Sequence, residues 1–135
     1  MVQILLGIFL LLHGLVHLLY SGQSARLFKL QPGMIWPDGS WSLSRIFGDE
    51  PTRVLASILC ALVTAGFLAG GIGLFASQSW WRPVVVASAV FSAMIFILLW
   101  DGKFQMLLNN GIFAILINIA ILVALLVFRW PRLGF

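Results

Sequence analysis

Charged residues are scarce in this chain of 135 residues: they make up 9% of it, and only four are acidic. Soluble domains carry charge on about a quarter of their residues, so the composition excludes an ordinary water-exposed surface. The single cysteine, Cys60, excludes an internal disulfide. Glycine-rich phosphate loops, Cys-x-x-Cys pairs and nucleophile elbows are missing too, so the sequence offers no motif for nucleotide, dithiol or serine-hydrolase chemistry.

Hydrophobic residues are abundant instead: they form 61% of the chain, and its mean hydropathy is +1.08. They gather in four continuous runs. As a helix, each run would be about as long as the hydrocarbon core of a bilayer is thick, which is roughly 30 Å. The runs are unbroken rather than alternating, which favours helices over the strands of a membrane barrel. The four predicted spans are residues 2–20, 52–75, 84–100 and 111–128.

Residues 1–135 are therefore predicted to form a single all-α transmembrane domain. Short connections after the second and third spans favour antiparallel neighbours, and hence an up-down-up-down four-helix bundle. The long first connection, residues 21–50, holds a Pro-Asp-Gly turn between Trp36 and Trp41, and tryptophan prefers the headgroup level. We expect this loop to be ordered, either resting on the membrane face or capping the bundle, with a short interfacial helix at Leu43–Phe47.

The eight Lys and Arg residues behind the net charge of +4 are scattered over loops and helix ends, as membrane anchors are, so nucleic-acid binding is not predicted. Five lie on the side of the first and third loops and three on the side of the termini, which favours both termini outside a bacterial plasma membrane. That small excess leaves a dual-topology antiparallel homodimer as the alternative. The five are Arg26, Lys29, Arg45, Arg53 and Lys103; the three are Arg82, Arg129 and Arg132.

Polar residues inside the predicted spans mark the candidate site. At 100° per residue, His13 and His17 share one face of the first span, and a stripe from Arg53 to Thr64 shares one face of the second. The rise per residue places His13, His17, Cys60 and Asn118 at similar depth. Ionisable residues within a span are candidates for function. The predicted polar layer and its rim consist of His13, His17, Arg53, Ser57, Cys60, Thr64, Asp101 and Asn118.

Three interpretations of this polar layer are open. It forms a buried network that fixes helix register, a pocket near the first and third loops for a small ligand or transported solute, or a metal site. His13 and His17, at i and i+4, place two imidazoles on one helix face, but Cys60, Asp101 or a partner subunit would have to complete a metal shell. A haem held by both histidines is geometrically unfavourable, and no cofactor is predicted.

The sequence thus favours a non-enzymatic role, as a ligand-binding or transport element or as an accessory subunit, and no catalytic residue is assigned. The alternative is a membrane redox or metal-binding protein that uses His13 and His17.

A ridge of small residues occupies the face of the second span opposite its polar stripe. Small residues let two helices approach closely, so the ridge is predicted to be a packing seam. We expect it to pack within the chain, and the alternative is a homo-oligomer interface. The ridge consists of Gly66, Ala69, Gly70 and Gly73.

The architecture supports one resemblance. The small size, the four spans, the long first loop and the polar first helix, which reads Leu6-Gly7-Ile8 and then His13-Gly14-Leu15, are similar to the DoxX-like group of small bacterial membrane proteins. The resemblance covers the whole chain as architecture and implies a four-helix membrane fold. It transfers no functional residue.

Overall fold

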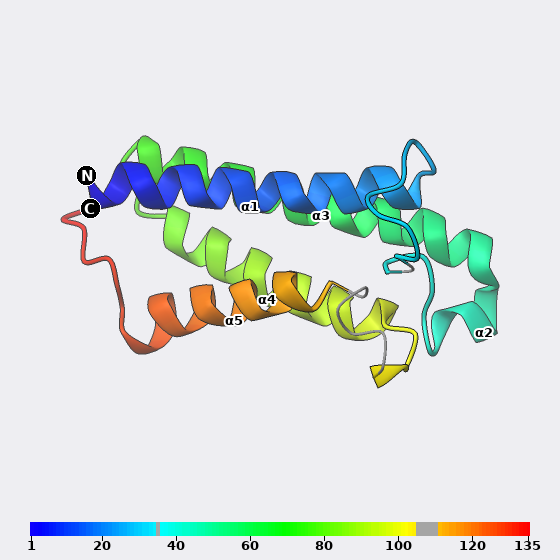
Figure 1. The fold of residues 1–135 in the computed structure, drawn as a ribbon. Coiled ribbons are helices and arrows are strands. Elements are labelled where there is room, and N and C mark those ends of the chain that lie inside the picture. Colours follow the sequence, from blue (N-terminus) through cyan, green and yellow to red (C-terminus); the bar gives the residue numbers. More distant parts are fainter. Residues whose placement is uncertain (35, 105–110) are drawn as a thin grey trace.

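The computed structural model describes residues 1–34, 36–104 and 111–135, and within them the regular structure is helical without any strand. This confirms the all-α prediction. The helices are α1 (Val2–Ser24), α2 (Leu43–Phe47), α3 (Asp49–Phe75), α4 (Trp81–Leu99) and α5 (Ile112–Leu122), which continues into a π-helical turn, η2 (Val123–Val127) (Figure 1).

Three of these helices, α1, α3 and α4, are long and apolar enough to cross a membrane. The fourth predicted span corresponds to α5 and η2, which together form a shorter apolar helix, Ile112–Val127. The fifth helix is α2, and it occupies the stretch at which the sequence predicts a short helix. Gly48 separates α2 from α3 with a φ of +85°, a backbone conformation that glycine adopts without strain.

The helix ends differ from the predicted spans for identifiable reasons. The first helix continues to Ser24 rather than ending at Tyr20, because α3 and the first loop hydrogen-bond its polar last turn. The third helix begins at Asp49, where acidic residues and Pro51 favour a helix N-terminus. Hydropathy alone does not register these polar turns.

The long helices pack in chain order, α1 on α3, α3 on α4 and α4 on α5. Consecutive long helices run antiparallel, so the two termini lie at one end of the molecule and the first loop with α2 lies at the other (Figure 1). We call these ends the terminal end and the loop end.

The ridge of small residues packs within the chain. Side chains added at Gly66, Gly70 and Gly73 would meet Ser88, Val85 and Trp80 of α4 and its preceding turn. The α1–α3 seam is equally close, since a Cβ at Gly14 would lie 3.1 Å from the Cβ of Phe67. Packing inside the chain therefore accounts for the ridge.

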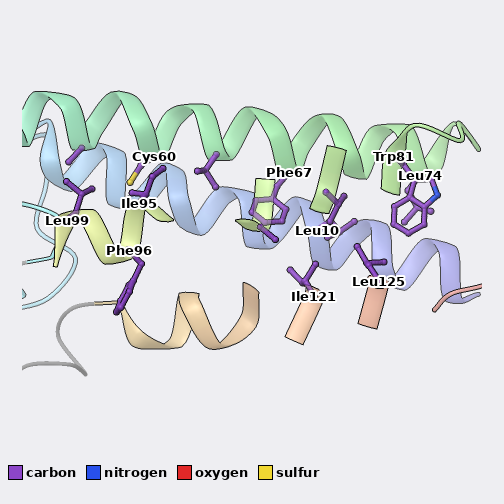
Figure 2. Packing of buried hydrophobic residues seen from close by; sticks show 14 of the residues in the cluster. Leu10, Cys60, Phe67, Leu74, Trp81, Ile95, Phe96, Leu99, Ile121 and Leu125 are labelled. Carbon is purple, nitrogen blue, oxygen red and sulfur yellow. The ribbon is translucent and has the colours of Figure 1, made fainter. Parts of the chain in front are cut away.

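The core is a column of apolar side chains between the helices. Figure 2 shows Leu10 opposite Ile121 and Leu125 at one part of this column, and Cys60 near Ile95 at another. Large apolar side chains also remain exposed on the outer faces of all four long segments, among them Leu12, Ile58, Met94 and Leu116. Extended exposed apolar faces of this kind are rare on soluble monomers, and they suit contact with lipid.

Candidate functional site

A cluster of four polar side chains is buried where α1, α4 and α5 meet. It consists of His13 and His17 of α1, Ser92 of α4 and Asn118 of α5, and the most exposed of them is only 5% accessible. His13 Nε2 lies 2.8 Å from Asn118 Oδ1, while Ser92 Oγ lies 2.7 Å from both Asn118 Nδ2 and His17 Nε2. His13 thus contacts the fourth apolar segment through Asn118. We call these four residues the histidine cluster.

The hydrogen bonds of the histidine cluster have one self-consistent direction. His17 Nδ1 lies 3.0 Å from the carbonyl oxygen of His13, which can only accept, so this nitrogen carries a proton. In neutral His17, Nε2 is then an acceptor, and the Ser92 hydroxyl donates to it. Asn118 Nδ2 in turn donates to Ser92, and Asn118 Oδ1 accepts from His13 Nε2. The bonds close into a ring that returns to His13.

Aromatic rings enclose this ring of hydrogen bonds. The Phe67 ring lies 4.8 Å from the His13 ring and 5.7 Å from the His17 ring, measured between centroids. Phe9 stacks on the other side of His13 at 6.0 Å. The low polarity of this environment strengthens the hydrogen bonds and raises the cost of leaving any of the groups unpaired.

The polar stripe of α3 forms a separate feature. Arg53 Nη1 donates to the Ser24 carbonyl at 2.6 Å, Ser57 bonds with Ser21, and Thr64 Oγ1 donates to the Gly14 carbonyl at 3.0 Å. Each bond joins α3 to α1. The stripe therefore faces inward, as its helical phase predicts, but it is a helix–helix seam rather than part of the histidine cluster.

Cys60 lies outside the histidine cluster as well. Its side chain is fully buried in the apolar core, and in the described ranges no hydrogen bond links its thiol to either histidine. Among the eight residues predicted for the polar layer and its rim, hydrogen bonds join His13 to His17 and to Asn118, and a separate bond joins Thr64 to the Cys60 carbonyl within α3. Rotation about the helix axis therefore separates Cys60 from the histidines, although the rise per residue places them at similar depth.

The loop end holds a second polar site, a cavity of about 470 Å³. Asp101, which follows α4, lines it together with residues of the first loop. Its lining includes basic and acidic side chains in equal number: Arg26, Lys29 and Lys103, and Asp38, Asp49 and Asp101. Arg26 and Asp38 form an ion pair, which joins the start of the first loop to its Pro-Asp-Gly turn.

Trp36 and Gln23 hold the loop over the helix ends. The amide nitrogen of Gln23 donates to the Trp36 carbonyl at 2.9 Å, and its oxygen accepts from the Leu30 amide at 3.0 Å. The indole of Trp36 is only 3% exposed and packs between Tyr20 and Phe96. Of the two loop tryptophans, Trp41 is 51% exposed, whereas Trp36 is part of the core, so the turn caps the bundle at Trp36.

Sequence reasoning missed two residues of these sites, Ser92 and Gln23. Ser92 reads as an ordinary packing residue, because a serine can satisfy its hydroxyl within its own helix, as Ser88 does by donating to Val84. The position of Gln23 just past an apolar run gives no indication that it is buried. Pairing with distant groups decides both roles.

The described residues contain no group of three or more His, Cys, Asp or Glu side chains placed to hold a metal ion. Comparisons of the chain with protein-family models, with curated proteins and with solved structures find no match. The interpretation of both sites therefore rests on their own geometry.

Proposed function

We propose that this chain is an integral membrane protein with four antiparallel spans, formed by α1, α3, α4 and the α5–η2 segment. The lengths and hydropathy of the first three support this, as do the exposed apolar outer faces. An even number of spans agrees with the two termini lying at one end (Figure 1). The distribution of basic residues supports termini outside a bacterial plasma membrane and the loop end in the cytoplasm.

Alkaline carbonate washing of membranes tests this placement. The expected result is that the protein stays in the membrane pellet and leaves it only with detergent. Release into the supernatant as a folded monomer would overturn the proposal.

Within the membrane protein, we propose that the loop-end cavity binds a small polar ligand and that the role is non-enzymatic. The cavity volume of about 470 Å³ falls in the range of about 300–1,000 Å³ that is usual for ligand pockets. Trp36 lines the cavity, and its buried indole Nε1 has no hydrogen-bond partner in the part of the chain that the structure describes. The cavity volume and its charged lining are the observation that carries the proposal, because a ligand pocket combines such a space with a few polar groups that orient the ligand.

The charges of the cavity indicate the class of ligand. Lys29 and Lys103 can attract a carboxylate or phosphate group, and Asp49 can attract an ammonium group. A lining with equal numbers of both signs favours a compact zwitterion over a simple anion or cation. Amino acids and phosphoethanolamine are the smallest common compounds of this class.

Thermal unfolding of the detergent-purified protein with single amino acids or phosphoethanolamine tests ligand binding. One of these probes should raise Tm, and at about 100 times its Kd it should stabilise the protein by about 2.7 kcal/mol. The Lys29→Gln, Lys103→Gln double variant should weaken binding, whereas Arg45→Gln, on α2 and outside the cavity lining, should not. No shift with any probe, or equal losses in both variants, would refute the cavity as the binding site.

The histidine cluster best fits a structural role, since its hydrogen bonds close on one another. The metal-binding alternative makes a distinct prediction that elemental analysis of purified protein can measure. Stoichiometric metal that is lost in both His13→Ala and His17→Ala would establish that alternative and overturn the structural assignment.

A further inference from the structure

A lateral groove runs along the terminal half of the molecule between α1 and the α5–η2 segment. It has a volume of about 430 Å³ and is lined by apolar side chains and tryptophans. Its floor consists of Leu10, Trp81, Ile121 and Leu125, all of which are buried (Figure 2). Its rim includes Phe9 and Trp130, which are 41% and 50% exposed. A buried floor with an exposed rim means that the groove opens sideways, toward the surroundings of the helices.

The groove ends at defined features in both directions. Toward the middle of α1 it stops at the histidine cluster, because Phe9 lines the groove and stacks on His13. Toward the terminal end it meets a basic hollow of about 550 Å³ lined by Arg82, Arg129 and Arg132, and Leu125 lines both spaces. The apolar groove and the basic hollow therefore adjoin at Leu125.

The π-helical turn η2 builds this junction. Arg82 donates from Nη1 to the Leu125 carbonyl at 3.0 Å and from Nη2 to the Pro131 carbonyl at 2.6 Å, which ties the last segment to α4. The Trp130 amide donates to the Ala124 carbonyl at 2.9 Å. These bonds hold Trp130 at the groove rim, between Arg129 and Arg132 in the sequence.

The positive charge at the terminal end has no acidic side chain near it. All four acidic residues of the chain lie in the first loop, at the start of α3 or just after α4, and thus at the loop end. In the described ranges the ion pairs join Arg26 to Asp38 and Arg53 to Glu50, both at the loop end. The contacts of Arg82 with carbonyl groups satisfy donors but do not cancel its charge. Acidic side chains of this chain therefore do not neutralise these arginines.

We propose that the groove binds one acyl chain of an anionic phospholipid, whose phosphate is held by Arg129 and Arg132. The apolar walls of the groove can contact the acyl chain, and the arginines can pair with the phosphate. Tryptophan at the rim agrees with a position at the headgroup level. A second copy inserted in the same direction fits less well, because a two-fold contact through this surface would bring two sets of arginines together. The proposal rests on the membrane location proposed above and is independent of the loop-end cavity.

Arg129 offers a variant that removes charge without straining the backbone. It follows η2 with a φ of +50°, a left-handed conformation that glycine adopts more readily than arginine. Arg129→Gly combined with Arg132→Gln should therefore keep the fold. Arg45→Gln, together with Arg26→Gln, removes two charges at the loop end and is the matched control. Ala120→Phe fills the groove from an exposed position, and Ala61→Phe adds the same ring to an exposed position of α3.

Native mass spectrometry of the detergent-purified chain, titrated with phosphatidylglycerol or phosphatidylcholine of matched chains, tests the proposal. Each arginine near an anionic lipid contributes about fivefold in affinity, so Arg129→Gly, Arg132→Gln should weaken phosphatidylglycerol binding about 25-fold. It should leave phosphatidylcholine binding nearly unchanged. Ala120→Phe should weaken the binding of both lipids. The two control variants should bind both lipids as the unmodified protein does.

Three outcomes would overturn the proposal. They are equal binding of the two lipids by the unmodified chain, an equal loss in the loop-end double variant and in Arg129→Gly, Arg132→Gln, and dimers that form in place of lipid adducts and disappear in Ala120→Phe. Carbonate washing separates these failures from a failure of the membrane placement, because it reports on insertion alone.

Discussion

Ser92 accepts one hydrogen bond and donates another within the histidine cluster, so Ser92→Ala removes two interhelical bonds with the loss of a single oxygen atom. The variant leaves Asn118 Nδ2 and His17 Nε2 without this partner in a buried environment. Interhelical hydrogen bonds in membranes contribute about 0.6 kcal/mol on average and at most about 1.7 kcal/mol. The loss of two such bonds should lower the free energy of unfolding by about 1.2 kcal/mol, with an upper bound of about 3.4 kcal/mol.

Ser88→Ala is the matched control, since Ser88 lies one turn earlier on the same helix and is also buried. Its hydroxyl donates only to the Val84 carbonyl of its own helix, so no interhelical bond is lost. We expect Ser88→Ala to change the free energy of unfolding by less than about 0.5 kcal/mol, as substitutions that break no tertiary contact usually do.

Reversible unfolding of the two variants in mixed micelles, with increasing sodium dodecyl sulfate, gives the difference in free energy of unfolding. Ser92→Ala should be less stable than Ser88→Ala by about 1 kcal/mol. A double variant with His17→Leu should show coupling, because the two residues share a bond. Equal stabilities for Ser92→Ala and Ser88→Ala, or strict additivity with His17→Leu, would refute the closed ring of hydrogen bonds.

Further substitutions probe the loop, the helix seam and the cluster. Trp36→Ala should free the first loop from the helix ends and make it sensitive to limited proteolysis, whereas Leu27→Ala, at an exposed position of the same loop, should not. Gly70→Leu should lower Tm strongly by forcing α3 and α4 apart, while Gly39→Ala, with open space around it, should leave Tm within about 1 °C. His13→Leu should cost about 0.6 to 1.7 kcal/mol in the same micelle assay, because it removes one interhelical bond.

The sequence predicts the helices because hydropathy is a local property. Each long helix coincides with a continuous apolar run, and Asp49 with its neighbours marks the start of α3 as the sequence indicates. The inward faces of α1 and α3 also follow from helical phase: His13, His17 and Thr64 are buried. Helical phase depends only on positions along one segment, so it can be calculated before any packing is known.

The composition of the sites depends on which helices meet. Ser92 and Asn118 are 26 residues apart, and His13 and Asn118 are 105 apart, so no local pattern joins them. The same holds for Trp36, whose burial requires Tyr20 and Phe96 on two different helices. Rotation of each helix about its axis, which packing decides, brings Asn118 to His13 and leaves Cys60 in the apolar core.

The sequence by itself thus determines that the chain is helical, apolar on its outer faces and asymmetric in charge. These properties depend only on composition, on the helical repeat and on the positions of the charged residues along the chain. Only the tertiary structure decides that two histidines close a hydrogen-bonded ring, that Trp36 packs beneath the polar cavity, and that three arginines adjoin an apolar groove. Each of these features joins segments through contacts of a few ångströms, and such contacts exist only after the helices have packed.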